Sequence, residues 1–330
     1  MTNDSATKRN PYINGEGEPE LCQSITAFVD ILGFKYLVKN ARKEKNSQAL
    51  FMDFHRVLST WFNREEDFWS CMNEMSIIGS QKDSFKIRIF TDCILIGCPI
   101  REKPHPWFSE GLKELNDVLI LLEMFQMEMT SNGYFVRGAI TVDELYMDDK
   151  IIYGNGVIEA YEAESKKAKY PRIILTKSVE EMLTEIDKGF ADQNFPNYIT
   201  KFLYKDFDGL IFINYLKFIN SRVSVHPPCL YPGSEAILAA ISADETSALP
   251  GGSERLHSRD VPFVNELEKH KNKIIENLNK HNNEPHILEK YLWTANYHNN
   301  FCEHGYDKYS IDLAQYQMQP VVGFYPAWQE

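Results

Sequence analysis

Two aspartates stand inside apolar, strand-like sequence, where a carboxylate can be held on a rigid element. Asp30 follows the apolar residues 27–29, and Asp92 interrupts the strand-like stretch 88–96. Catalysis with two divalent metal ions needs hard oxygen ligands a few ångströms apart on rigid elements. One such aspartate alone is more often a helix cap or a turn residue. Two of them, in the order that a palm-type sheet requires, favour a shared metal site.

The residues after Asp30 offer a second kind of chemistry. Gly33 turns the chain, and an amphipathic segment begins at Phe34. A glycine turn that leads into a helix presents free backbone N–H groups to phosphate. The signal is weak by itself, because many helices begin after a glycine. The sequence contains no Walker A loop and no GxGxxG motif, and the stretch 154–156 (Gly-Asn-Gly) is too short to count as one.

Three arginines in strand-like sequence are candidates for anion binding. Arg137 is flanked by Val and Gly, so its guanidinium must reach solvent, a carboxylate or an anion such as phosphate. Pairing with a structural carboxylate and binding of phosphate are equally compatible with this position. For Arg172, which follows Tyr-Pro, the sequence favours a salt bridge at a sheet edge. Arg88 shares a face with Asp92 if the alternation of residues 85–89 continues into the turn.

Composition excludes several other classes. The net charge of −12 and the pI near 5.3 argue against non-specific binding to nucleic acid or to anionic membranes. The six cysteines form no CxxC pair, which indicates reduced, packing cysteines in a cytoplasmic protein. His281 and His286 lack partners at metal-ligand spacing, and no GxSxG elbow is present. We expect no signal peptide and no membrane span.

The order of predicted elements indicates a mixed α/β (α+β) fold, in which helices cover a sheet. Strand, two helices, hairpin, helix and strand follow one another, which fits a ferredoxin-like palm that presents carboxylates at the rim of its sheet. The predicted strands, helices and hairpin lie at residues 24–30, 35–43, 47–64, 85–98, 110–131 and 134–145, followed by a strand at 151–153, a helix at 154–167, a strand at 171–176 and a helix at 177–188.

Three parts of the chain are predicted. Residues 1–20 are polar and form a flexible arm, and residues 21–216 form the main domain. Residues 217–330 form a mostly helical extension packed on that domain, with helices near 264–278 and 287–297.

Several motifs together resemble the class III nucleotidyl cyclases. Residues 28–34 (Phe-Val-Asp-Ile-Leu-Gly-Phe) resemble the first metal motif of that family, and residues 90–92 (Phe-Thr-Asp) resemble the second, which normally has glycine before the aspartate. The closer resemblance is to the bacterial pyrimidine cyclases of anti-phage defence (Pycsar cyclases). That branch shares Arg-Gly-Ala-Ile-Thr, Glu-Ala-Tyr-Glu-x-Glu and Tyr-Pro-Arg-Ile, which stand here at 137–141, 159–164 and 170–173. The resemblance covers roughly 22–216.

The resemblance implies a role for each matched position. Asp30 and Asp92 would bind two Mg²⁺ or Mn²⁺ ions, with the backbone carbonyl of Ile31 as a further ligand. The remaining roles concern the nucleotide: backbone N–H groups near Gly33 and Phe34 would hold the triphosphate, Arg137 would contact a phosphate, and Arg88 would stand where adenylate cyclases place a base-selecting lysine. The several donors of an arginine suit the carbonyl oxygens of a pyrimidine.

Three positions depart from the purine cyclases of the family. Ile158 and Glu162 occupy the places of the asparagine and arginine that stabilise the transition state, and Ile151 that of a base-recognising carboxylate. Either another cation, such as Arg137 or Arg172, takes over, or activity is weak or absent. The losses argue against ATP as the substrate.

The resemblance therefore implies a lyase that converts UTP or CTP to the 3′,5′-cyclic monophosphate and pyrophosphate. It also implies a homodimer with sites at the interface, and an indirect link to an effector that senses the cyclic nucleotide. One alternative is a catalytically inactive dimerising or nucleotide-sensing module. Another is a polymerase-like palm that acts on nucleic acid, which the acidic composition disfavours.

Overall fold

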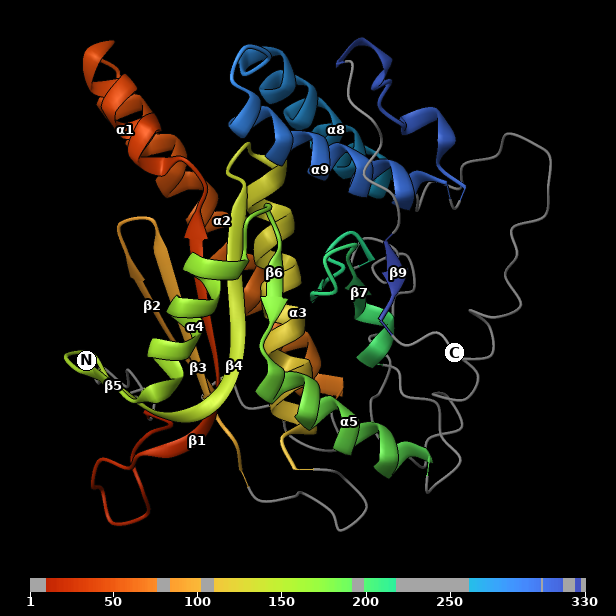
Figure 1. The fold of residues 1–330 in the computed structure, drawn as a ribbon. Helices are drawn as coiled ribbons and strands as arrows, with labels where there is room; N and C mark the ends of the chain where they lie inside the picture. The colour runs from red at the N-terminus through yellow and green to blue at the C-terminus, as the bar shows by residue number, and fades with distance from the viewer. Residues whose placement is uncertain are drawn as a thin grey trace.

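The computed structural model describes residues 10–75, 84–101, 110–191, 199–217, 261–303, 305–316 and 324–327. The chain forms a mixed α/β structure around one sheet, as the order of predicted elements indicated (Figure 1). The strands run β2-β3-β1-β4-β6-β8-β7-β9 across the sheet, and β5 pairs with β4 outside that path. Only the pair β4·β6 is parallel among the pairs of the described residues.

The first half of the sheet is an antiparallel block with β1 at its centre. Its elements are β1 (Cys22–Ile31), α1 (Phe34–Lys43), α2 (Ser47–Met75), β2 (Lys86–Phe90), β3 (Cys93–Pro99), α3 (Leu112–Ser131) and β4 (Val136–Met147). β1 lies between β3 and β4 and pairs antiparallel with both. Every predicted element of this block is present, and α2 continues beyond its predicted end.

The second half extends the sheet with short strands. Its elements are β5 (Ile152–Tyr153), α4 (Asn155–Lys167), β6 (Ile173–Leu175), α5 (Lys177–Ala191), β7 (Leu203–Lys205), β8 (Ile211–Ile213), α8 (Val261–Lys280), α9 (Pro285–Cys302) and β9 (Tyr325–Pro326).

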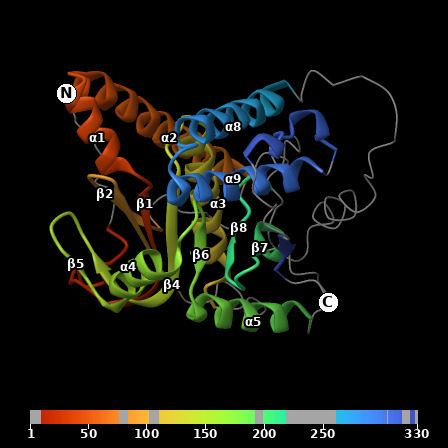
Figure 2. The ribbon, with the colours of Figure 1, turned by 45° about the horizontal axis from the view of Figure 1, so that its top comes forward.

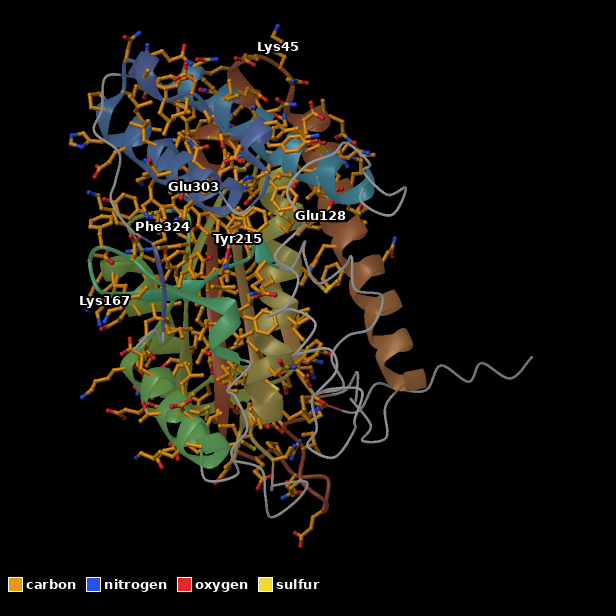
Figure 3. All side chains as sticks on the ribbon, turned by 90° about the vertical axis from the view of Figure 1, so that its right-hand side faces the viewer. Lys45, Glu128, Lys167, Tyr215, Glu303 and Phe324 are labelled. Carbon is orange, nitrogen blue, oxygen red and sulfur yellow. The ribbon has the colours of Figure 1, made fainter. Side chains whose placement is uncertain are left out.

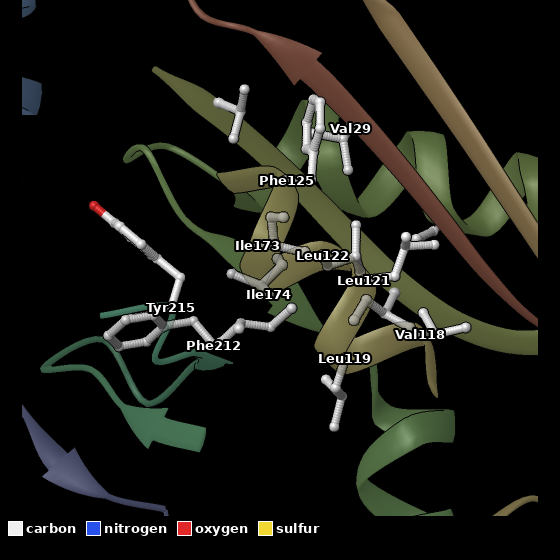
Figure 4. Close-up of a cluster of buried hydrophobic side chains, with 14 of the residues drawn as sticks. Val29, Val118, Leu119, Leu121, Leu122, Phe125, Ile173, Ile174, Phe212 and Tyr215 are labelled. Carbon is white, nitrogen blue, oxygen red and sulfur yellow. The ribbon is translucent and has the colours of Figure 1, made fainter. Parts of the chain in front are cut away.

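Helices cover both faces of the sheet. α4 lies on one face of β1 and β4, and α3 lies on the other, with α2 outside it (Figure 1). The alternation along β1 sets the two faces, because Val29 and its neighbours at odd positions pack against α3. Val118, Leu122 and Phe125 of α3 meet Val29 and Ile173 in the core (Figure 4). α3 is buried nearly all round, as expected of a helix enclosed between other layers.

The helical pair α8–α9 lies at the end of the sheet where β1 leads into α1 (Figures 1 and 2). Trp293 and Tyr297 of α9 belong to the main core, so this pair is part of the same packed body. Figure 3 shows Tyr215 and Phe324 on the side of the pair that faces the sheet. β9 adds a further edge strand by pairing with β7. Residues 218–260 of the predicted extension lie outside the described residues.

The described part of the predicted flexible arm is packed at Pro11 and Tyr12, whereas residues 15–20 are exposed. Tyr12 is fully buried among side chains of β3 and β4, and the carbonyl of Pro11 accepts a hydrogen bond from Arg101. Residues 1–9 lie outside the described residues. Among the described helices, none is long and apolar enough to cross a membrane.

Candidate functional site

Asp30 lies near the end of β1, at the end of the sheet where β1 leads into α1. This end of the sheet is called the rim below. The register pairs it with Cys93 of β3 on one side and with Arg137 of β4 on the other. The next residue, Ile31, donates its backbone N–H to the carbonyl oxygen of Asp92 at 3.0 Å. This bond fastens the tip of the β2–β3 hairpin to β1, so the two aspartates are brought together as predicted.

The hairpin tip that carries Asp92 has an unusual backbone. Thr91 has a φ of 55°, in the left-handed region that β-branched residues rarely adopt. Its hydroxyl donates to Oδ1 of Asp92 at 2.7 Å. The cyclase motif has glycine at this place, and the positive φ supplies a physical reason for that preference. Thr91 lacks the conformational freedom of glycine, but its hydroxyl makes a hydrogen bond that orients the Asp92 carboxylate.

The two carboxylates and the thiol of Cys93 form the one group of metal-ligating side chains found in the described part of the chain. Their ligand atoms lie within 4.8 Å of one another. Burial and, to a smaller extent, the negative charges of Asp30 and Asp92 raise the pKa of the Cys93 thiol to about 12. A thiol is a soft ligand, so Cys93 is a poor donor for a hard cation. The donors that remain are two carboxylates, which fit Mg²⁺ or Mn²⁺.

Arg137 holds two acidic groups together at the back of this site. Its Nε lies 3.3 Å from Oδ2 of Asp30 and 2.8 Å from Oε1 of Glu164 on α4. Its Nη1 donates to the carbonyl of Ala168 at 3.5 Å. No partner of Nη2 is recorded among the described residues, and a quarter of the side chain is exposed. The guanidinium thus keeps donors for an incoming anion.

Burial works against charge on both acids. Desolvation raises the pKa of Asp30, and Arg137 opposes that effect. Desolvation likewise raises the pKa of Glu164, again opposed by Arg137. One guanidinium shared between the partly buried Asp30 and the buried Glu164 leaves a local excess of negative charge, which a bound cation would relieve.

Gly33 begins α1 beside Asp30. Its φ of 75° is left-handed, and its carbonyl accepts from the N–H groups of Tyr36 and Leu37. In the described part of the chain no acceptor is recorded for the N–H groups of Phe34 and Lys35. These two amides at a helix N-terminus can receive an anion.

Arg88 is on the same sheet face as Asp30, two strands away. The register pairs it with Leu95 of β3, which in turn faces Phe28 of β1. Its Nε donates to the carbonyl of Asp148 at 3.0 Å, and Nη2 lies 3.3 Å from Asp149. Its guanidinium is therefore directed toward the β4–β5 hairpin.

Arg172 is not at this site, so its guanidinium is not available to a ligand bound near Asp30. Its side chain is 0% exposed and pairs with Asp206 and Asp208. Three aromatic rings enclose the guanidinium, those of Tyr170, Phe212 and Trp293. The predicted salt bridge is present, but it is buried inside the fold instead of lying at a sheet edge.

Ile158 and Glu162, where the sequence departs from the purine cyclases that it resembles, lie on the exposed side of α4. Ile158 is 56% exposed, and Glu162 pairs with Lys166 along the same helix at 2.8 Å. Ile151 is also exposed, next to β5.

Sequence reasoning missed three residues that the structure adds to the rim. Cys93 stands next to Asp92, and Glu164 ends the Glu-Ala-Tyr-Glu-x-Glu motif, so a strand arginine seeking a carboxylate could have pointed to Glu164. Lys290 of α9 lies close enough to lower the pKa of Asp30. No local pattern in the sequence connects Lys290 with β1.

Comparison with known proteins adds no relative. No protein-family model matches the chain, and no curated protein matches it.

Proposed function

We propose that the protein is a pyrimidine nucleotide cyclase, which converts UTP or CTP to the 3′,5′-cyclic monophosphate and releases pyrophosphate. The observation that carries this proposal is the convergence of Asp30 and Asp92 at one rim, joined by the bond from the Ile31 amide to the Asp92 carbonyl. The cyclase resemblance assigns metal binding to both carboxylates, and their proximity supports that role.

The order of the strands supports the finer assignment of a ferredoxin-like palm. β1, β2, β3 and β4 lie in the spatial order 4-1-3-2 and are antiparallel throughout. Helices follow β1 and β3, as in a βαββαβ unit. The carboxylates then lie on β1 and at the β2–β3 turn, which is the placement expected for the metal ligands of this family.

The residues of the rim would divide the work of binding and positioning. Asp30, Asp92 and the carbonyl of Ile31 would hold two Mg²⁺ or Mn²⁺ ions. Such ions lower the pKa of a ribose 3′-hydroxyl and neutralise charge on the pyrophosphate leaving group. Arg137 would orient the α-phosphate, while the amides of Phe34 and Lys35 would receive the terminal phosphates. Glu164 would keep the Arg137 guanidinium in place when Asp30 turns to a cation.

Arg88 supports the choice of a pyrimidine. Its guanidinium is held at the β4–β5 hairpin by Asp148 and Asp149, on the sheet face that carries Asp30. A guanidinium can donate to the carbonyl oxygens at the edge of a pyrimidine. The Arg88→Met variant should therefore raise KM for the pyrimidine nucleotide more than it lowers kcat.

Exposed apolar side chains support a homodimer with sites at its interface. Phe90 at the hairpin, Tyr153 on β5, and Ile158 and Tyr161 on α4 are all exposed. Phe28 contacts both the Phe90 and the Tyr161 ring, so these side chains belong to the sheet face that bears the site. Apolar groups gathered on a surface mark interaction sites. Sedimentation of the Ile158→Glu variant should show a shift toward monomer relative to the parent protein.

The proposed activity is tested with purified protein and Mn²⁺. Each of the four nucleoside triphosphates is supplied, and cyclic nucleotide and pyrophosphate are measured by mass spectrometry. We expect product from UTP or CTP. Its absence from both would overturn the proposal, and product made by Asp30→Ala or Asp92→Ala would overturn the site.

The proposed biological role is signalling in anti-phage defence through an effector that senses the cyclic nucleotide. The absence of a transition-state asparagine and arginine at Ile158 and Glu162 favours the inactive dimerising or nucleotide-sensing module as the second candidate. Nucleotide binding without any cyclic product, measured on the same preparation, would identify that module.

A further inference from the structure

The helix α9 passes beside the end of β1. Leu32, two residues after Asp30, packs against the cluster that contains Leu288, Tyr291 and Leu292 of α9. On the other side, Glu289 accepts from Nζ of Lys169 at 2.7 Å and from the hydroxyl of Tyr170 at 3.0 Å. The first half of α9 is therefore fixed between β1 and the segment that follows α4.

These contacts lead directly to the rim. Lys169 follows Ala168, whose carbonyl accepts from Nη1 of Arg137, and Arg137 pairs with Asp30. Lys290 is adjacent to Glu289 in sequence and is half-buried. Lys290 therefore lies in the part of α9 that is packed between Leu32 and Lys169.

The electrostatic surroundings of Lys290 are consistent with this position. Burial lowers its pKa, and Arg137 and Lys169 lower the pKa further, while Glu289 and Asp30 oppose the change. Lys290 in turn is one of the cations that lower the pKa of Asp30. The ammonium therefore shares a local environment with both members of the Arg137–Asp30 pair.

Lys290 differs from the neighbouring cations in having no carboxylate of its own. Lys169 pairs with Glu289, and Arg137 pairs with Asp30 and Glu164. Over the described ranges, no carboxylate oxygen is recorded within 4.0 Å of the Lys290 ammonium. A half-buried ammonium beside two other cations is stabilised by an anion that lies among them.

We infer that Lys290 is a phosphate-binding residue of the rim, which holds the polyphosphate of the nucleotide together with Arg137. This inference rests on the proposed function and adds to it a residue from outside the palm. It supplies a positive charge within the same chain, whereas neither Ile158 nor Glu162 of α4 carries one. A lysine ammonium is a compact point charge with three donors, which suits a phosphate oxygen.

The test measures binding of inorganic tripolyphosphate in the presence of Mn²⁺ by isothermal titration calorimetry. The full chain is compared with Lys290→Gln, Lys290→Arg and the control Lys269→Gln, an exposed lysine of α8 that pairs with Glu266. We expect Lys290→Gln to weaken binding by 10- to 100-fold, according to the value of a charge-assisted hydrogen bond. Lys290→Arg should restore most of the affinity, and Lys269→Gln should leave it unchanged.

Each other outcome is decisive. Equal binding by the parent protein and Lys290→Gln would overturn the inference, and so would a failure of the parent protein to bind tripolyphosphate. An equal loss in Lys269→Gln would show a non-specific charge effect and would also overturn it. Thermal unfolding of each variant checks that α9 remains docked.

The same variants separate this inference from the proposed function. If the parent protein forms no cyclic product from UTP or CTP, the cyclase proposal fails while binding through Lys290 can still hold. If the parent protein is active, a transition-state role for Lys290 lowers kcat in Lys290→Gln, whereas a ground-state role raises KM with kcat preserved.

Discussion

Arg137 and Arg172 show how the same residue type serves two purposes in one sheet. Both stand beside a pair of acids, Asp30 and Glu164 for the first, Asp206 and Asp208 for the second. Arg172 is 0% exposed and enclosed by aromatic rings, whereas the side chain of Arg137 is 25% exposed at the rim.

The two arginines differ in whether an external anion can reach the guanidinium. Arg172 has its charge neutralised inside the core, and Trp293 adds a hydrogen bond to Asp206 at 2.8 Å. No anion can reach it without unfolding the cluster. Arg137 holds its acids at 3.3 and 2.8 Å and retains donors toward solvent. Enclosure, more than the identity of the partners, separates a structural arginine from one available for binding.

The largest expected effect concerns the rim. Asp92→Asn keeps the shape of the side chain and removes a metal ligand, so the proposed cyclase activity should fall by about 10³-fold or more, or roughly 4 kcal/mol of barrier. The urea midpoint should change little, because the backbone bond from Ile31 to residue 92 is retained. Product formation under saturating Mn²⁺ measures the loss. Glu181→Gln, on the exposed surface of α5, is the matched control, and undiminished activity of Asp92→Asn would remove Asp92 from the site.

The buried arginine should affect stability instead. Arg172→Met leaves two carboxylates without their cation, one of them fully buried, and should cost about 3–5 kcal/mol of the free energy of unfolding. Arg137→Met should cost less, about 1–3 kcal/mol, because Asp30 can still reach water although Glu164 is buried. Urea unfolding followed by tryptophan fluorescence compares the two. Similar costs for both variants would contradict the contrast between rim and core.

A buried histidine pair makes the stability of the core depend on pH. His270 and His298 face each other through their Nδ1 atoms at 2.9 Å, and Tyr215 contacts the far nitrogen of His270 at 2.7 Å. Burial lowers the pKa of His298 to about 4 and the pKa of His270 well below its ordinary value.

Because the folded state disfavours the charged form, the unfolded chain binds more protons below its histidine pKa of about 6.5. Stability is therefore complete above that pH and is lost as pH falls toward 4, by about 3 kcal/mol for a shift of this size. Urea midpoints at pH 7.5, 6 and 5 measure the decline. The double variant His270→Gln/His298→Gln should flatten it, and an equally steep decline in that variant would contradict the assignment.

The smallest effect concerns the hairpin tip. Thr91→Gly relieves a left-handed backbone and should raise the free energy of unfolding by about 1 kcal/mol. It also removes the hydroxyl that orients Asp92, so the proposed activity should fall by a few fold. Thermal unfolding and the product assay follow the two effects separately. A loss of stability would show that the hydroxyl bond outweighs the strain.

Local patterns were sufficient to predict that Asp30 and Asp92 meet, but not the surroundings of Arg172. The apolar run 27–29 before Asp30 and the interruption at Asp92 are properties of neighbouring residues, and the convergence of the aspartates follows once the strands pair. The environment of Arg172 depends on Trp293, which is remote in sequence. Whether an arginine in a strand is enclosed is decided by such distant elements, so its burial could not be predicted.

The C-terminal helices illustrate the same limit. Their apolar spacing predicted two helices, and Leu267, Ile274 and Leu278 are buried as that spacing requires. Nothing in the spacing indicates against which surface they pack. The position of Lys290 beside β1 follows from that packing and so was not predictable.

The late arrival of α9 has a consequence for the newly made chain. The roughly 120 residues between Arg172 and Trp293 take on the order of 10 s to translate. During that interval the strands of the rim can pair, while the aromatic enclosure of Arg172 is still open and Lys290 has not yet been synthesised. Contacts of such long sequence separation form last and slow folding. The side of the rim that includes Lys290 is therefore completed only after α9 has been synthesised and docks.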